Sequence, residues 1–246
     1  MEETSRALLL IADISGFTRF MRLHALTTSH ARQIIVRLLK TLVDTARPPL
    51  QVAELEGDAV FFYALTTEEQ LPQAAAEVKV QILRFFQAFK REIAALGQVT
   101  ACVCEACTNV GQLQLKQVIH CGEVAVEQID RFEKLFGLDV ILVHRMLKNT
   151  VPSREYLMMT NPAYAACADF YTLEPERRTE DFEGVGAVET LVFYDTSLAG
   201  VLNQVPPDEP PPSLPENIGW KLKMHGRTLL ELLGLRKREA APSVPV

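Results

Sequence analysis

The chain has 246 residues, 48% of them hydrophobic, which is enough for one substantial domain with an appendage or for two small domains. A formal net charge of −6 argues against a dedicated nucleic-acid-binding protein, because such proteins neutralise phosphates with a basic surface. No run reaches the roughly 18 apolar residues that span a bilayer, and we expect a cytoplasmic protein whose five cysteines stay reduced.

Apolar patterning predicts alternating strands and helices along residues 1–196, which we take as one domain. The predicted elements, in chain order, are a strand at 7–12, a helix that begins near 27–29 and ends before Pro48, strands at 50–55 and 59–65, a helix at 71–96, strands at 114–121 and 123–129 on either side of Gly122, a helix at 139–149, a strand at 156–160, a short helix at 162–168, and strands at 170–173 and 188–194. Because helices alternate with antiparallel hairpins, we expect an α+β fold with helices on one face of a mostly antiparallel sheet.

The composition changes after this domain. Residues 197–217 are rich in proline and predict a linker. Residues 218–246 interleave leucines with lysines and arginines, which is the pattern of a basic amphipathic helix. Such a helix can bind an anionic membrane surface, but we favour docking on the domain or on a second subunit.

Two aspartates lie at predicted strand ends. Asp13 follows the first strand and precedes a Ser-Gly turn, and Asp58 lies at a glycine turn between two strands. Paired carboxylates suit Mg²⁺ or Mn²⁺, which bridge to substrate phosphates, and backbone N–H groups at a helix start after Gly16 would favour the same phosphates. The same positions also fit a helix cap at Asp13 and a plain turn at Asp58, since aspartate is common at both.

Four segments resemble the motifs of class III adenylyl and guanylyl cyclases, and they occur in the family's order. They are residues 11–18 (IADISGFT), residues 54–60 (ELEGDAV), residues 119–124 (IHCGEV), and residues 135–137 (LFG) followed by 143–146 (VHRM). The chain looks closest to a bacterial branch of this superfamily, the group known as DUF2652. The resemblance implies a ferredoxin-like class III nucleotide cyclase fold over residues 1–196, followed by the linker and the tail.

The resemblance also implies a metal site and a phosphate site. Asp13, Asp58 and the carbonyl of Ile14 match the ligands of two divalent metal ions, Mg²⁺ or Mn²⁺, that activate the ribose 3′-hydroxyl and neutralise phosphate charge. The residues of the turn after Asp13 match substrate-binding positions. These turn residues are Gly16, Phe17 and Thr18.

The base-reading and transition-state positions follow from the other motifs. Glu54 matches the residue that reads the purine, and as a carboxylate it accepts hydrogen bonds from guanine N1–H and N2–H₂, which favours GTP slightly over ATP. Lys134 falls on the partner base-reading position, where family members have Asp, Cys or a similar residue. Arg145 matches the catalytic arginine, whereas Ile141 replaces the transition-state asparagine and residues 182–186 (FEGVG) replace the motif with the triphosphate lysine.

The resemblance therefore implies a divergent cyclase-like signalling domain that binds divalent metal and a purine nucleoside triphosphate. Because cyclase sites are shared between subunits, it also implies a homodimer or a heterodimer with another cyclase-type chain. If the chain is catalytic, it is a nucleotide cyclase, a phosphorus–oxygen lyase. Two alternatives stay open: a catalytically silent nucleotide-binding or dimerisation module, and a scaffold stabilised by a metal.

The cysteine run at residues 102–107 (CVCEAC) lies in a predicted loop insertion, residues 98–113. Thiolates at this spacing can converge on one structural Zn²⁺. Its predicted ligands are Cys102, Cys104 and Cys107, with Cys121, His120 or a dimer partner as the fourth. The alternative is that these residues are free thiols or that they fill gaps in the core.

Overall fold

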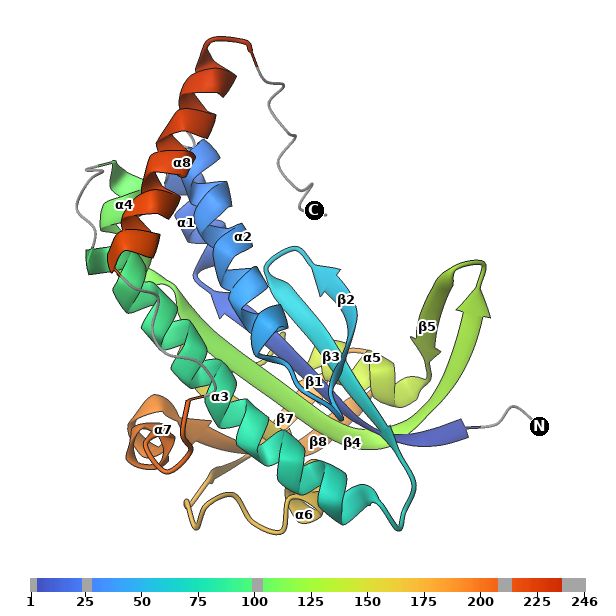
Figure 1. Cartoon of the computed structure of the whole chain (residues 1–246). Helices are drawn as coiled ribbons and strands as arrows, with labels where there is room; N and C mark the ends of the chain where they lie inside the picture. The colour runs from blue at the N-terminus through green and yellow to red at the C-terminus, as the bar shows by residue number, and fades with distance from the viewer. Residues whose placement is uncertain (1–3, 24–27, 99–103, 208–213, 236–246) are drawn as a thin grey trace.

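One eight-stranded sheet organises the chain, and the computed structural model describes residues 4–23, 28–98, 104–207 and 214–235 (Figure 1). The strands are β1 (Thr4–Ser15), β2 (Gln51–Glu56), β3 (Ala59–Thr66), β4 (Gln114–Ile129), β5 (Phe132–Phe136), β6 (Tyr156–Thr160), β7 (Glu176–Phe182) and β8 (Gly186–Tyr194). Their order is β2-β3-β1-β4-β6-β8-β7, and β5 pairs with β4 off this path. Only β4 and β6 pair in parallel, so the predicted mostly antiparallel sheet is confirmed.

Most of the described helices cover one face of the sheet. The helices are α1 (Phe17–Leu23), α2 (Thr28–Thr45), α3 (Leu71–Gln98), α4 (Glu105–Thr108), the short 3₁₀ helix η2 (Val110–Gln112), α5 (Leu138–Arg145), α6 (Asn161–Ala166), α7 (Asp195–Leu202) and α8 (Leu214–Leu232). Successive residues of a strand point to opposite faces. Leu8 and Leu10 of β1 therefore join the main core with α2 and α3, whereas Leu9 and Ile11 join a smaller core with α5. The predicted fold class is confirmed, with α5 added on the second face.

One prediction for this sheet was wrong: residues 114–129 form the single strand β4 and not two strands around Gly122. Gly122 serves close packing, because an added Cβ would overlap the carboxylate of Asp139 on α5. That carboxylate accepts a hydrogen bond from the Glu123 backbone N–H at 2.6 Å and lies 3.0 Å from His120 Nε2. His120 also contacts Thr160 through Nδ1 at 2.8 Å, so it has a structural role in joining β4, β6 and α5.

The predicted strand at residues 170–173 was also wrong. Tyr171 and Thr172 have φ angles of 53° and 55°, in the left-handed region of a turn, and Phe170 is fully buried beside them. The strand that pairs with β8 is instead β7, whose sequence ERRTEDF is highly charged. Charged residues are typical of an edge strand, where they discourage pairing with other chains.

The C-terminal helix α8 docks on α2, as we favoured for the tail (Figure 1). The polar pairs between the two helices are Arg32–Glu231 at 3.0 Å, Arg37–Asn217 at 2.7 Å and Ser29–Thr228 at 3.0 Å. The segment predicted as a linker contains most of α7, and its residues 208–213 lie outside the described part of the chain. Among the helices that the structure describes, none has the length and apolarity needed to cross a membrane.

Candidate functional site

The sheet brings Asp13 and Asp58 together at one end of β1. Asp13 is opposite Ala59 in the antiparallel β1–β3 pair, so it lies next to the turn between β2 and β3. The Ile14 backbone N–H donates to the backbone carbonyl of Asp58 at 3.0 Å, which ties the two segments together. Gly57, with φ of 63°, takes the left-handed conformation that this tight turn requires.

These aspartates line a polar cleft of about 340 Å³. The lining includes all six residues of the predicted metal and phosphate sites. They are Asp13, Ile14, Gly16, Phe17, Thr18 and Asp58. The lining also includes the cationic side chains Arg19, Lys116 and Arg154, together with the polar residue Asn149. The cleft therefore combines two carboxylates with several groups that suit an anionic ligand.

Burial and mutual repulsion oppose ionisation of both carboxyl groups. Burial raises the pKa of Asp13, and the neighbouring Lys116, with Nζ 3.4 Å from Oδ1, partly offsets this increase. Burial, together with the charge of Asp13, raises the pKa of Asp58 to about 6. Two carboxylates that share a partly buried site without a full counter-charge behave in this way. A divalent cation between them would supply that charge.

Sequence reasoning missed the cations of this cleft. Lys116 lies on β4 directly opposite Asp13 of β1, and its Nζ also donates to the Leu147 carbonyl at 3.3 Å. Arg154 precedes β6, and its Nη1 lies close to the Gly16 turn. One signal was available for Lys116, because it is the single lysine or arginine of β4. No local pattern singled out Arg154.

The predicted base-reading residues pair with each other. Lys134 Nζ on β5 donates to Glu54 Oε2 on β2. Two residues after Glu54 on β2, Glu56 is hydrogen-bonded to His144 of α5, with 2.7 Å between Oε1 and Nε2. The carboxylates of this strand thus have cationic or hydrogen-bonding partners. Neither residue of the Glu54–Lys134 pair lines the cleft at Asp13.

The predicted catalytic arginine lies on α5, away from the cleft lining. Arg145 Nη1 donates to Glu183 Oε2 at 2.8 Å, and Glu183 follows β7 in the segment that replaces the lysine motif. Ile141, one turn earlier on α5, is 48% exposed. The structure therefore separates the candidate metal residues from the candidate transition-state residues within one chain.

The predicted zinc ligands separate into two places. Cys102 lies outside the described residues, whereas Cys104 and Cys107 lie beside His30 of α2, a residue that the sequence did not indicate. Cys121, the predicted fourth ligand, is not among the described residues whose ligand atoms cluster with these. It is buried in the middle of β4, where it is opposite Leu8 of β1.

Comparison with known proteins identifies relatives in sequence and in fold. The family model described as "Protein of unknown function (DUF2652)" matches residues 35–156. The uncharacterized protein Rv2561/Rv2562 of Mycobacterium tuberculosis is 36% identical over 210 residues, which cover 82% of this chain and 91% of that protein.

Several solved structures share the fold. The guanylyl cyclase Cya2 aligns with a TM-score of 0.56 and 16% identity, covering 78% of this chain and 92% of that one. The adenylyl cyclase CyaB from P. aeruginosa aligns with a TM-score of 0.53 and 14% identity over 78% and 95% of the two chains. A class III adenylyl cyclase-like ATP-binding protein from Pseudomonas aeruginosa aligns with a TM-score of 0.53 and 20% identity, over 66% of this chain and 35% of that one. At these identities the likeness concerns the fold.

Proposed function

Because this chain belongs to the DUF2652 family and has the fold of the class III nucleotide cyclases, we propose that it is a cyclase-like signalling domain that binds a purine nucleoside triphosphate with divalent metal ions. The observation that carries the proposal is the composition of one cleft. Asp13 and Asp58 face it from two adjacent segments of the sheet, and Lys116 and Arg154 line the same space. Carboxylates beside cations match a metal–triphosphate complex, which presents both signs of charge.

The residues present fit Mg²⁺ or Mn²⁺. The carboxylates of Asp13 and Asp58 and the backbone carbonyl of Ile14 supply the oxygen ligands that these hard cations prefer. The pKa of Asp58, raised to about 6 by burial and then by the charge of Asp13, supports the fit because a bound cation would offset both effects. When bound, such ions neutralise phosphate charge and activate a hydroxyl nucleophile.

The base would be read by the Glu54–Lys134 pair. Glu54 can accept two hydrogen bonds from guanine, at N1–H and N2–H₂, but only one from the adenine amino group. Lys134 can donate to guanine O6. We therefore place GTP ahead of ATP as the preferred nucleotide.

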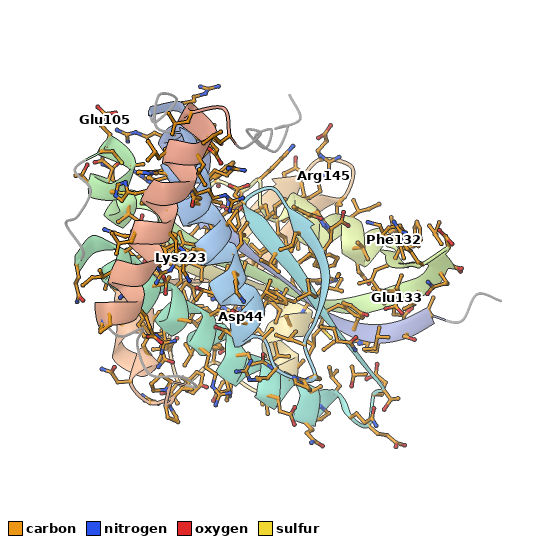
Figure 2. All side chains as sticks on the ribbon, turned by 45° about the horizontal axis from the view of Figure 1, so that its top comes forward. Asp44, Glu105, Phe132, Glu133, Arg145 and Lys223 are labelled. Atoms are coloured by element: carbon orange, nitrogen blue, oxygen red, sulfur yellow. The ribbon has the colours of Figure 1, made fainter. Side chains whose placement is uncertain are left out.

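A second chain would complete the site. Large apolar side chains are exposed on the β4–β5 hairpin and on α5. They are Ile129, Phe132, Phe136, Leu138 and Ile141. Figure 2 shows Phe132 and Glu133 at the far end of this hairpin. An exposed apolar patch of this kind is typical of a protein–protein interface, and we propose a homodimer or a dimer with another cyclase-type chain.

Calorimetric titration of GTP and ATP, with Mn²⁺ and with EDTA, tests the binding proposal. We expect binding that requires metal and is at least about tenfold weaker in Asp58→Ala, since one lost charge-assisted contact is worth about 1.5–3 kcal/mol. Asp181→Ala, at an exposed carboxylate of β7, is the matched control and should bind as the wild type does. Equal affinity with metal and with EDTA, or no binding of either nucleotide, would refute the proposal.

Cyclisation of the nucleotide is the second candidate function, and the intact pair of metal carboxylates favours it. Ile141 cannot donate the hydrogen bond that the resembling asparagine supplies, and such donors are worth about 10²–10³ in rate. Ile141→Asn should therefore raise the rate of cyclic nucleotide formation by about that factor. The exposed position tolerates the polar side chain. A variant that binds nucleotide but forms no cyclic product would leave the silent binding module as the function.

A further inference from the structure

His30, Cys104 and Cys107 form a cluster that the nucleotide cleft does not include. Their ligand atoms all lie within 4.8 Å of one another. His30 Nδ1 and Cys104 Sγ are 3.3 Å apart. His30 and Cys107 are each only 7% exposed, and Cys104 is partly buried. Three potential metal ligands from two elements distant in sequence thus meet in the protein interior.

The spacing matches a tetrahedral zinc ion. With Zn–S bonds of about 2.3 Å and Zn–N bonds of about 2.0 Å, ligand atoms on a tetrahedron lie about 3.5–3.8 Å apart. The 3.3 Å separation of His30 Nδ1 from Cys104 Sγ is close to this edge length. The remaining separations, all within 4.8 Å, need only small side-chain movements to reach it.

The charges also favour a metal. Burial lowers the pKa of His30, and the nearby His225 and Lys221 lower it further. Two thiolates, one neutral imidazole and Zn²⁺ sum to zero charge. A neutral cluster can be buried without the large penalty of an isolated ion.

The helix α8 covers this cluster. The ring of His225 packs edge-on against His30, with ring centroids 4.8 Å apart. The buried Nε2 of His225 has no hydrogen-bond partner among the described residues. A fourth ligand on the metal, such as water, would give this nitrogen a partner. Figure 2 shows Glu105, which follows Cys104, on α4 beside α8.

We propose that His30, Cys104 and Cys107 bind one structural Zn²⁺ that joins α4 to α2 beneath α8. The site is independent of the nucleotide cleft. The helix α4 has only four residues, so a metal would supply the cohesion that its own hydrogen bonds cannot. Loss of the ion is expected to loosen α4 and the adjoining contacts of α8.

Cobalt titration of the full chain, stripped of metal under reducing conditions, tests the site. We expect one equivalent of Co²⁺ to produce a thiolate-to-cobalt charge-transfer band that Zn²⁺ abolishes. Cys104→Ser and Cys107→Ser should lose the band, and His225→Ala should weaken cobalt affinity about tenfold, the usual effect of removing a residue that supports a ligand. Cys121→Ser and Asp58→Asn are the matched controls and should keep the band.

A wild-type protein without the band, or a band that survives in Cys104→Ser, would overturn the proposal. A second measurement needs no variant. Treating the wild type with iodoacetamide should label Cys104 and Cys107 at least about fivefold more slowly with Zn²⁺ than with EDTA, because a metal-bound thiolate is a poor nucleophile. Equal labelling in both conditions, or a Cys104–Cys107 disulfide that forms in the presence of Zn²⁺, would also refute it.

Discussion

Replacing Asp58 with asparagine is expected to stabilise the metal-free protein at neutral pH while removing a ligand from the proposed metal site. The reason is that Asp58 is destabilised as an anion by burial and by the charge of Asp13. Asparagine has nearly the same shape and no charge. The backbone hydrogen bond from Ile14 to the carbonyl of residue 58 is unaffected by the change.

The magnitude follows from the pKa of Asp58, which is raised from 3.8 to about 6. At about 1.36 kcal/mol per pH unit, this difference corresponds to about 3 kcal/mol at pH 7. Because the side chain is partly exposed, solvent screening reduces the expected gain to about 1–2 kcal/mol. For a chain of this size that is about 3–6 °C in Tm.

The direction of the pKa shift determines how the stability difference between the two proteins changes with pH. The folded protein binds the Asp58 proton more tightly than the unfolded chain does, so the wild type loses stability as pH rises through about 6. The advantage of Asp58→Asn should therefore be full above pH 6 and should vanish as the pH falls towards 4. Saturating Mn²⁺ should reverse the order at pH 7.5 by stabilising only the wild type.

Thermal denaturation of both proteins in EDTA, from pH 4.5 to pH 8, measures this effect. Asp181→Asn, at an exposed position of β7, controls for a general effect of reduced negative charge. If Asp58→Asn melts below the wild type at pH 8 in EDTA, then burial and repulsion do not destabilise the Asp58 carboxylate and its pKa is not raised. The electrostatic argument for a cation site would then fail with it.

Three further changes test other parts of the structure. Arg154→Met should weaken GTP binding about tenfold while leaving Mn²⁺ binding unchanged, because one charge-assisted hydrogen bond to phosphate is lost; calorimetry measures both. Gly122→Ala should lower the free energy of unfolding by about 1–3 kcal/mol, because the added methyl group overpacks against α5. Gly111→Ala, with no atom near the added methyl group, should not have this effect, and urea denaturation compares the two variants. Arg32→Met should lower the free energy of unfolding by about 3 kcal/mol and expose α8 to proteases, since it leaves the buried Glu231 carboxylate without this cation.

Each of these changes has an outcome that contradicts the reasoning. Arg131→Met, at an exposed arginine after β4, is the control for Arg154→Met, and equal weakening by both would point to a general charge effect. Equal stability of Gly122→Ala and Gly111→Ala would mean that the Asp139 contact does not need the glycine. Unchanged proteolysis of Arg32→Met would mean that apolar contacts, and not the Glu231 pair, hold α8 on α2.

The elements that sequence alone predicts well are those with a continuous buried apolar run. The strands at 7–12 and 156–160 are flanked by other strands on both sides, so nearly every residue is apolar. The strand β7 was missed because it lies at the sheet edge, where charged residues such as Arg178 pair with one another and leave no apolar run. Residues 170–173 show the opposite error, in which an apolar segment is not a strand. Phe170 is buried although the residues that follow it form a turn.

The residues of the candidate site also fall into those that local sequence predicts and those that it does not. The motifs place Asp13 and Asp58 because each lies in a short segment with a recognisable turn. Lys116 joins Asp13 only through the register of β1 against β4, and Arg154 reaches the cleft from the start of β6. His30 lies 74 positions from Cys104 along the chain. Contacts of this kind are set by the order of strands and helices in space, which no local spacing encodes.

Several of the candidate functional charges are paired within the chain, and the strengths of these pairs indicate which of them a ligand can separate first. Arg145 pairs with Glu183, a side chain that is 82% exposed, and such surface pairs are worth about 0–1 kcal/mol. A ligand can displace that pair at little cost. The Asp13–Lys116 pair is more buried, and separating it would strand a carboxylate in the protein interior unless another cation replaces the lysine.

A divalent ion at Asp13 would provide that replacement and would at the same time release Lys116 to contact phosphate. One exchange of cations would then both complete the metal site and supply a phosphate ligand. Metal and nucleotide should therefore bind cooperatively, because each stabilises the arrangement that the other requires. It follows that the metal-free protein should bind nucleotide weakly even though the lysine and the arginine of its cleft are already in place.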